Sequence, residues 1–220
     1  MSRSALKRLV PPVVIGLVAL LFWDSGLVYP LRVFVVFLHE ISHGLAAILT
    51  GGRIVAIGLT FDEGGVCITD GGSRFLILNA GYLGSLFWGA LFLVLSARTR
   101  ASREITGFVG VFVLVVTLLY VRSWFGFAYG LLTGAALVWA AVKLPRDVVD
   151  DLLQTIGVVS CLYAVWDVGS DVLGRDVPGS DASALGLLTR IPGVLWGLAW
   201  IALSLVVVFL ALRLVARGGR

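Results

Sequence analysis

The chain has 220 residues, of which 59% are hydrophobic and only 14% are charged. Soluble domains contain about 45–50% apolar and about 25% charged residues, so this composition excludes an ordinary soluble globule and also a disordered chain. The net charge of +4 comes from basic residues at the ends of apolar runs, without a dense basic stripe, which argues against a nucleic-acid partner.

The length fits one domain, residues 1–220, with room for six or seven transmembrane helices at about 20 residues each. The first apolar segment, residues 11–23, is short for a span and lacks the cleavage site of a signal peptide, so we expect a retained membrane segment. It is either re-entrant or extends past Asp24. A second apolar segment, residues 27–50, ends at two consecutive glycines, a typical helix stop.

Residues 53–70 have a different pattern. Two β-rich runs, 54–61 and 66–69, are separated by turn-forming residues 62–65, which predicts a β-hairpin. An isolated hairpin is only marginally stable, so we expect it to pack on the helices or to pair with an extended segment.

The remaining apolar runs predict further helices, and a polar stretch separates the last two of them. We expect these helices at residues 75–96, 105–121, 124–142, 148–173 and 192–215. The sequence therefore predicts an all-α polytopic membrane protein, with six to seven transmembrane helices and one short β-hairpin, surrounded by the lipid bilayer.

The only two histidines, His39 and His43, lie four residues apart in the second apolar segment, and Glu40 directly follows the first. Residues at this spacing share one face of a helix, so both imidazoles can bind one zinc ion. This is the H-E-x-x-H pattern of zinc peptidases, in which the glutamate acts as a general base toward water rather than as a metal ligand.

The alternative is that the two histidines have this spacing by chance and pair with backbone or aromatic neighbours. Ionisable groups inside a membrane segment are costly, however, and usually serve a function. Three of them at neighbouring positions need a compensating partner, which favours Zn²⁺.

A catalytic zinc ion takes three protein ligands and keeps one open position. Without a third histidine, we expect the remaining ligand to be an aspartate. Asp167 and Asp171 lie four residues apart on the predicted helix 148–173. Asp181 lies at a predicted helix start, where aspartate is also a common N-cap. On residue chemistry alone all three remain candidates.

The sequence resembles the site-2 protease superfamily of intramembrane zinc metalloproteases (M50 peptidases), and more narrowly its M50B-like branch of small polytopic membrane proteins. The resemblance rests on residues 37–44, the glycines at 51–52, the hairpin, and the segments 79–84 and 179–182. It implies a Zn²⁺-dependent enzyme that hydrolyses peptide bonds of membrane proteins or peptides within or beside the bilayer. It also implies a multi-pass protein of a bacterial cell membrane.

The resemblance bears on two further residues. The Ser-Asp-Ala element around Asp181 recurs in the M50B-like branch, which favours Asp181 as the third ligand, with Asp167 second and Asp171 third. The Leu-Asp-Gly ligand motif of better-known site-2 proteases is absent. Aspartates that do not bind the metal would orient a histidine ring. By the same resemblance, Asn79 would face the cleft and steady an extended substrate, which the hairpin would hold as an added strand.

Two alternatives to a protease follow from the same pattern. The first is a catalytically silent membrane scaffold that keeps the fold and binds a partner helix. The second is a transporter, which usually has internal repeats, and none is detectable here. The sequence does not identify the substrate or the oligomeric state.

The membrane orientation is also open. The resemblance places the hairpin in the cytosol, which puts the later basic loops outside if every helix spans. The positive-inside rule favours the reverse for those loops.

Overall fold

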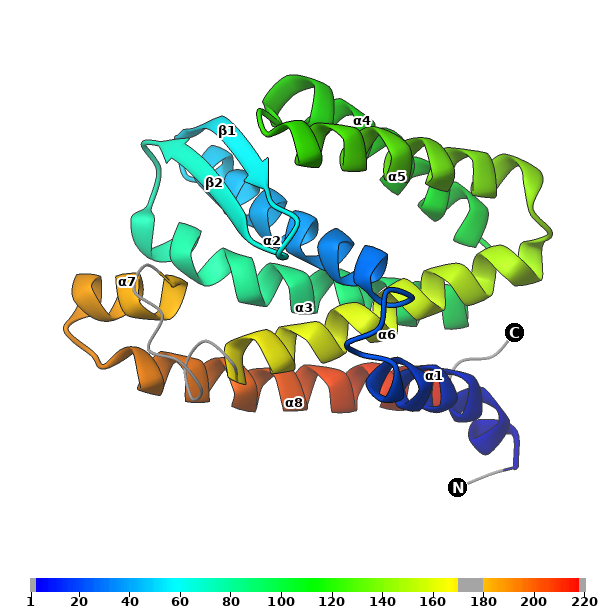
Figure 1. Ribbon diagram of the computed structural model, residues 1–220. Helices are drawn as coiled ribbons and strands as arrows, with labels where there is room; N and C mark the ends of the chain where they lie inside the picture. The colour runs from blue at the N-terminus through cyan, green and yellow to red at the C-terminus, as the bar shows by residue number, and fades with distance from the viewer. Residues whose placement is uncertain (1–2, 170–179, 218–220) are drawn as a thin grey trace.

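The computed structural model describes residues 3–169 and 180–217, and the side chains from residue 9 onward. Those residues form eight α-helices and one two-stranded antiparallel sheet (Figure 1). In chain order the elements are α1 (Arg3–Leu21), α2 (Tyr29–Leu49), β1 (Arg53–Leu59), β2 (Gly65–Asp70), α3 (Arg74–Arg98), α4 (Ser102–Tyr120), α5 (Trp124–Lys143), α6 (Arg146–Gly169), α7 (Asp181–Thr189) and α8 (Gly193–Arg217).

Six helices are long and apolar enough to cross a membrane: α2, α3, α4, α5, α6 and α8. The apolar part of α1, Leu9–Leu21, is shorter than the roughly 20 residues that a 30 Å hydrocarbon core requires. The prediction of six to seven transmembrane helices with a short hairpin is therefore confirmed. Of the predicted helix 148–173, only the part up to Gly169 lies among the described residues.

Helix α2 lies at the centre of the fold. It begins with Pro30 in its first turn, and Gly51 follows its end with a φ of 86°, a conformation that glycine adopts without steric cost. Residues 33–38 are all buried, so this helix is covered on every side, as expected of a helix enclosed by others. It packs against α3, α6 and both strands.

Helix α3 packs against α2, α6 and α8. Glycines allow the closest of these approaches, because a Cβ on Gly89 would lie 2.8 Å from the backbone nitrogen of Cys161, and one on Gly157 would lie 2.7 Å from that of Leu93. Small residues at such crossings let two membrane helices pack backbone to backbone. The α3–α6 pair thereby forms a closely packed support for the central helix.

The hairpin lies across α2. Its register pairs Arg53 with Asp70 and Leu59 with Gly65. The outer edge of β1 is covered by the connection between α4 and α5, because Arg122 donates its backbone N–H to Ile57 and Ser123 accepts the N–H of Leu59. Within the described residues, the outer edge of β2 pairs with no strand.

One end of the helix bundle carries arginines at the termini of three helices. Figure 1 places the end of α3, the starts of α4 and α6, and the end of α8 together on the right-hand side, where Arg98, Arg146 and Arg217 lie. The hairpin and α7 lie toward the opposite side in the same view.

Candidate functional site

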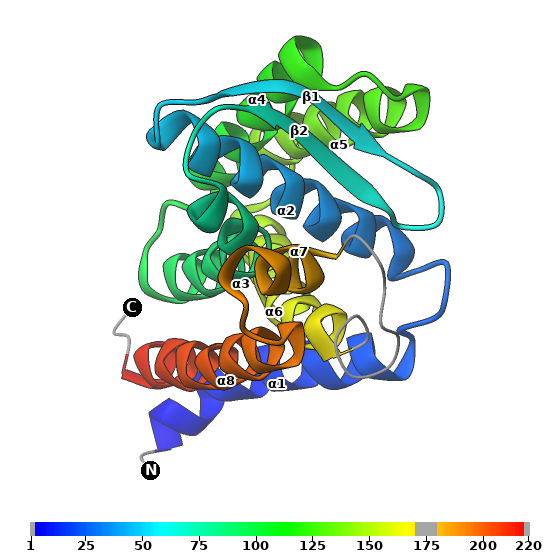
Figure 2. The same cartoon turned by 90° about the vertical axis from the view of Figure 1, so that its left-hand side faces the viewer.

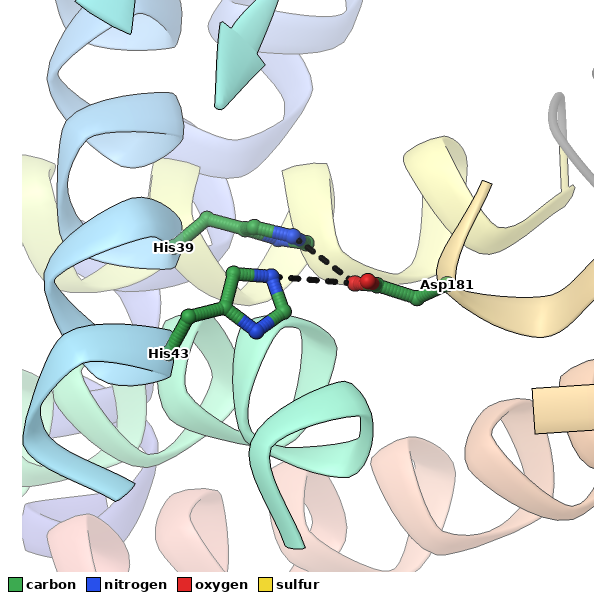
Figure 3. Close-up of side chains that lie close together, drawn as sticks. All are labelled: His39, His43 and Asp181. Atoms are coloured by element: carbon green, nitrogen blue, oxygen red, sulfur yellow. Dashed lines mark hydrogen bonds and ion pairs between the residues drawn. The ribbon is translucent and has the colours of Figure 1, made fainter. Parts of the chain in front are cut away.

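His39, His43 and Asp181 converge in space although Asp181 is far from the histidines in the sequence. The Nε2 atoms of both histidines lie 3.1 Å from the Oδ2 atom of Asp181. Figure 3 shows the two imidazoles pointing from α2 toward the carboxylate at the start of α7. The ligand atoms of the three residues all lie within 4.8 Å of one another. The site is thus assembled from two helices that only the tertiary fold brings together.

The orientation of the His43 ring determines which of its nitrogens can act as a donor toward Asp181. Its Nδ1 lies 2.7 Å from the carbonyl oxygen of Ile77 on α3. A carbonyl only accepts, so Nδ1 carries the proton. In a neutral ring Nε2 then presents a lone pair to the Asp181 carboxylate oxygen. Two acceptors at 3.1 Å repel unless a proton or a metal cation lies between them.

These donors suit zinc. Two imidazole nitrogens and one carboxylate oxygen form the usual ligand set of a catalytic zinc site with one open position. Ligands at about 2.0–2.1 Å from a tetrahedral zinc ion lie roughly 3.3 Å apart, close to the 3.1 Å found here. The carbonyl bond of His43 is the kind of outer contact that fixes the ring of a metal-binding histidine.

Helix α3 approaches the two histidines closely because Gly81 faces them. A Cβ at position 81 would overlap the Nε2 atoms of both His39 and His43. The next residue, Tyr82, packs edge-on against the His39 ring, with the ring centroids 5.0 Å apart at an angle of 90°. Trp200 of α8 lies behind Tyr82, at 4.8 Å between ring centroids.

Glu40 lies on the adjacent side of α2, beneath the hairpin. It is only 5% exposed. A Cβ on Gly65, the first residue of β2, would overlap its carboxyl group. One turn further along, Gly44 allows the same close approach, because its Cβ would lie 2.5 Å from a side-chain atom of Ile54. The histidines therefore face α3 and α7, whereas Glu40 faces Gly65, the first residue of β2.

The start of α7 explains why Asp181 is available to the histidines. The N-cap is Ser180, whose hydroxyl oxygen accepts the backbone N–H of Ser183 at 3.3 Å. Asp181 is the first helical residue, so it does not act as the cap. Ala182 and Leu185 are buried against Tyr82 and Trp200, and this contact holds α7 on α3 and α8. Figure 2 shows α7 between the central helix and α8.

The other predicted site residues lie in different settings. Asp167, on α6, is half-buried and is not part of the converging group, although it lies close enough for its charge to act on His39. Asp171 lies outside the described residues. Asn79 bridges two helices, because its Nδ2 donates to the carbonyl of Phe75 and its Oδ1 accepts from Nε1 of Trp200 at 3.0 Å. Its role toward substrate stays a prediction.

Sequence reasoning missed the residues that surround the two histidines and Glu40. Tyr82 lies in the segment 79–84 that carried the family resemblance, so its position on the His39 ring had a weak signal. Gly65 was read as part of the turn, whereas it opens β2 against Glu40. The contact from Ile77 is made by its backbone carbonyl, so no side-chain pattern in the sequence could have indicated it.

Comparison with known proteins gives one match. A model of the Peptidase M50B-like family matches residues 13–211. No curated protein and no solved structure matches the chain. The matched region includes every residue of the converging group and Glu40.

Proposed function

The chain belongs to the M50B-like peptidase family, and from this premise we propose that it is a zinc-dependent intramembrane peptidase. The observation that carries the proposal is the convergence of His39, His43 and Asp181 in a chain with six candidate membrane spans. A buried, acceptor-rich cluster of this kind is costly inside a membrane unless a cation compensates it. The substrate class is a membrane-spanning or membrane-adjacent protein or peptide.

In the proposed site, His39, His43 and Asp181 hold the metal. Zinc supplies Lewis-acid polarisation of the peptide carbonyl and activation of a water molecule. The carbonyl of Ile77 keeps the Nε2 lone pair of His43 aimed at the site. Asp181 also contributes a negative charge that offsets part of the charge of the dication. Asp167 is a candidate for orienting His39 from α6.

Glu40 is the proposed general base. It takes a proton from the attacking water and later delivers it to the nitrogen of the leaving amine. Its burial between α2 and the start of β2 keeps bulk water away from the carboxylate. Gly65 lets β2 pass directly over the carboxyl group, because a Cβ at that position would overlap it.

The hairpin supports a way to hold the substrate. A membrane helix must unwind before its peptide bonds can be cleaved, and an unwound segment pairs readily with a free strand edge. The outer edge of β1 is already covered by residues 121–123, whereas β2 begins beside Glu40. We therefore assign the edge of β2 as the docking strand, with Asn79 as a further polar contact.

The decisive experiment uses the full chain reconstituted in liposomes with a panel of transmembrane peptides. Glu40→Gln is expected to retain about one zinc per chain, measured by elemental mass spectrometry, and to lose cleavage. His43→Ala is expected to lose both zinc and cleavage. Glu104→Gln, an exposed glutamate on α4, is the matched control and should behave as wild type.

Two results would contradict the proposal. Full zinc occupancy in His43→Ala would show that the metal binds elsewhere. Zinc binding by the wild type without cleavage of any peptide in the panel would favour the silent scaffold that binds a partner helix.

A further inference from the structure

A polar cavity of about 250 Å³ lies at the basic end of the bundle, away from the site described above. It opens where the connection between α3 and α4 meets the start of α6. The residues that line it are Arg100, Ser102, Arg103, Arg146, Asp147 and Asp150. Neither the proposed metal ligands nor Glu40 take part in it.

Two hydrogen-bond donors at this cavity are buried without a partner. Ser102 is only 2% exposed, and its hydroxyl bonds to no atom of the described residues. Arg103 donates from Nη2 to the carbonyl of Leu144, but its Nε–H is buried and unpaired. Buried donors without partners are rare in folded proteins, because each loses its hydrogen bonds to water. We therefore expect each of these two donors to form a hydrogen bond with an acceptor that the described part of the chain does not supply.

The backbone at the start of α4 also favours an acceptor at this cavity. Ser102 is the first residue of α4, and the N-cap, Ala101, has no side chain that can bond to the first free N–H groups. The N-terminus of a 19-residue helix carries a partial positive charge that favours an anion. Arg100 and Arg146 bring two further guanidinium groups to the cavity, and guanidinium groups match the oxygen geometry of phosphate.

We propose that this cavity binds a phosphate group. A phosphate offers several acceptor oxygens directed to different sides, which suits donors from Ser102, Arg103 and the arginines at the rim. The phosphate has two possible sources. Because the cavity lies at the ends of the candidate spans α3, α4 and α6, the headgroup of a phospholipid reaches it. A soluble phosphate reaches it from the aqueous side.

One of the two acidic residues in the lining, Asp147, gives the proposal a second, opposite test. The carboxylate of Asp147 opposes an anion in the same cavity. Its removal should therefore strengthen phosphate binding, whereas the loss of an arginine weakens it. A general loss of fold cannot produce changes of both signs.

The experiment uses the full chain in an uncharged detergent. Retention of dioleoyl phosphatidic acid is measured by native mass spectrometry, with dioleoylglycerol, which lacks the phosphate, as the reference lipid. Binding of inorganic phosphate is measured in parallel by its effect on thermal stability against an equal concentration of chloride. Arg103→Gln and Ser102→Ala test the buried donors, Arg100→Gln tests the exposed rim, and Arg98→Gln is the control outside the cavity.

We expect Arg100→Gln and Arg103→Gln each to weaken phosphate binding by about tenfold, the usual effect of losing one charge-assisted hydrogen bond. Ser102→Ala should have a smaller effect, Arg98→Gln none, and Asp147→Asn should increase binding. Retention of the lipid alone identifies a headgroup site, and stabilisation by inorganic phosphate identifies a soluble ligand. Equal binding by the wild type, Arg100→Gln and Arg103→Gln, or equal retention of dioleoylglycerol, would overturn the proposal.

Discussion

Gly65 lies directly against the carboxyl group of Glu40, so closely that a Cβ at position 65 would overlap it. The first residue of β2 therefore limits the position of the residue proposed as the general base. An added methyl group at position 65 therefore requires the Glu40 carboxyl group or the start of β2 to move.

The first prediction concerns this contact. Gly65→Ala should keep the zinc and lower peptide cleavage by about a hundredfold, since a displacement of about 1 Å at a reacting group has effects of that size. Zinc content and the cleavage rate in liposomes are measured side by side. Gly26→Ala is the control, because its added Cβ meets no atom within 4 Å. Unchanged cleavage by Gly65→Ala would refute the role of this contact.

The second prediction concerns the close approach of Gly81 to the two histidines. Gly81→Ala places a methyl group against both Nε2 atoms and should abolish zinc binding. In a helix interior, replacing glycine by alanine normally stabilises by about 1 kcal/mol, so the loss of metal cannot be ascribed to a weaker helix. Gly107→Ala, whose Cβ makes only an ordinary contact at 3.5 Å, should retain full zinc. Zinc occupancy in Gly81→Ala would disprove the assigned metal position.

The third prediction distinguishes a metal ligand from a helix N-cap at the start of α7. Asp181→Asn should lose most of its zinc, because a direct ligand contributes both a bond and a charge. Ser180→Ala should keep the zinc and lose about 0.5–2 kcal/mol of stability, the usual cost of removing an N-cap. Asp167→Asn should weaken zinc binding by about 10–100-fold if it orients a ligand. If Asp181→Asn lost only stability, Asp167 would become the ligand candidate.

The fourth prediction concerns the tip of the hairpin. Arg32, at the start of α2, pairs with Glu63 in the turn at 2.8 Å and lies 5.7 Å from the centre of the Trp23 ring. Burial raises the pKa of Glu63, and the Arg32 guanidinium offsets part of that rise. Arg32→Gln should therefore leave a poorly solvated carboxylate and loosen the turn.

Hydrogen exchange across residues 53–70 measures this effect. We expect faster exchange in Arg32→Gln and a smaller change in Glu63→Gln, which keeps a neutral acceptor for Arg32. Arg53→Gln is the control, because its ion pair with Asp70 is exposed and exposed pairs contribute about 0–1 kcal/mol. Equal exchange in all three variants and the wild type would exclude an anchoring role for Arg32.

The fifth prediction concerns topology. With α1 too short to span, the start of α4 and the end of α8 should face one side of the membrane and the connection from α2 to β1 the other. Single cysteines at positions 53, 100 and 217, in a chain lacking Cys67 and Cys161, report this by labelling with a membrane-impermeant reagent. Labelling of positions 53 and 100 from the same side would refute the arrangement.

Much of the architecture was predictable from the sequence because the local composition of a segment is enough to identify a membrane helix. Long apolar runs between polar residues allow little besides a helix in a bilayer, and the structure has six such candidate spans. The hairpin was equally local, since its two β-rich runs and its turn are contiguous. The first segment was ambiguous by length, and the structure contains it as α1, outside the six candidate spans.

The histidine pair and Glu40 were also readable from the sequence, because the helical period alone decides that His39 and His43 share a face. Residue chemistry did not single out the third member, since Asp167, Asp171 and Asp181 are chemically alike, whereas the family resemblance favoured Asp181. Only the packing of Ala182 and Leu185 against Tyr82 and Trp200 brings Asp181 to within 3.1 Å of both imidazoles. The close approaches of Gly65 and Gly81 were likewise decided by tertiary structure, because a glycine's neighbours come from distant segments whose positions no local pattern encodes.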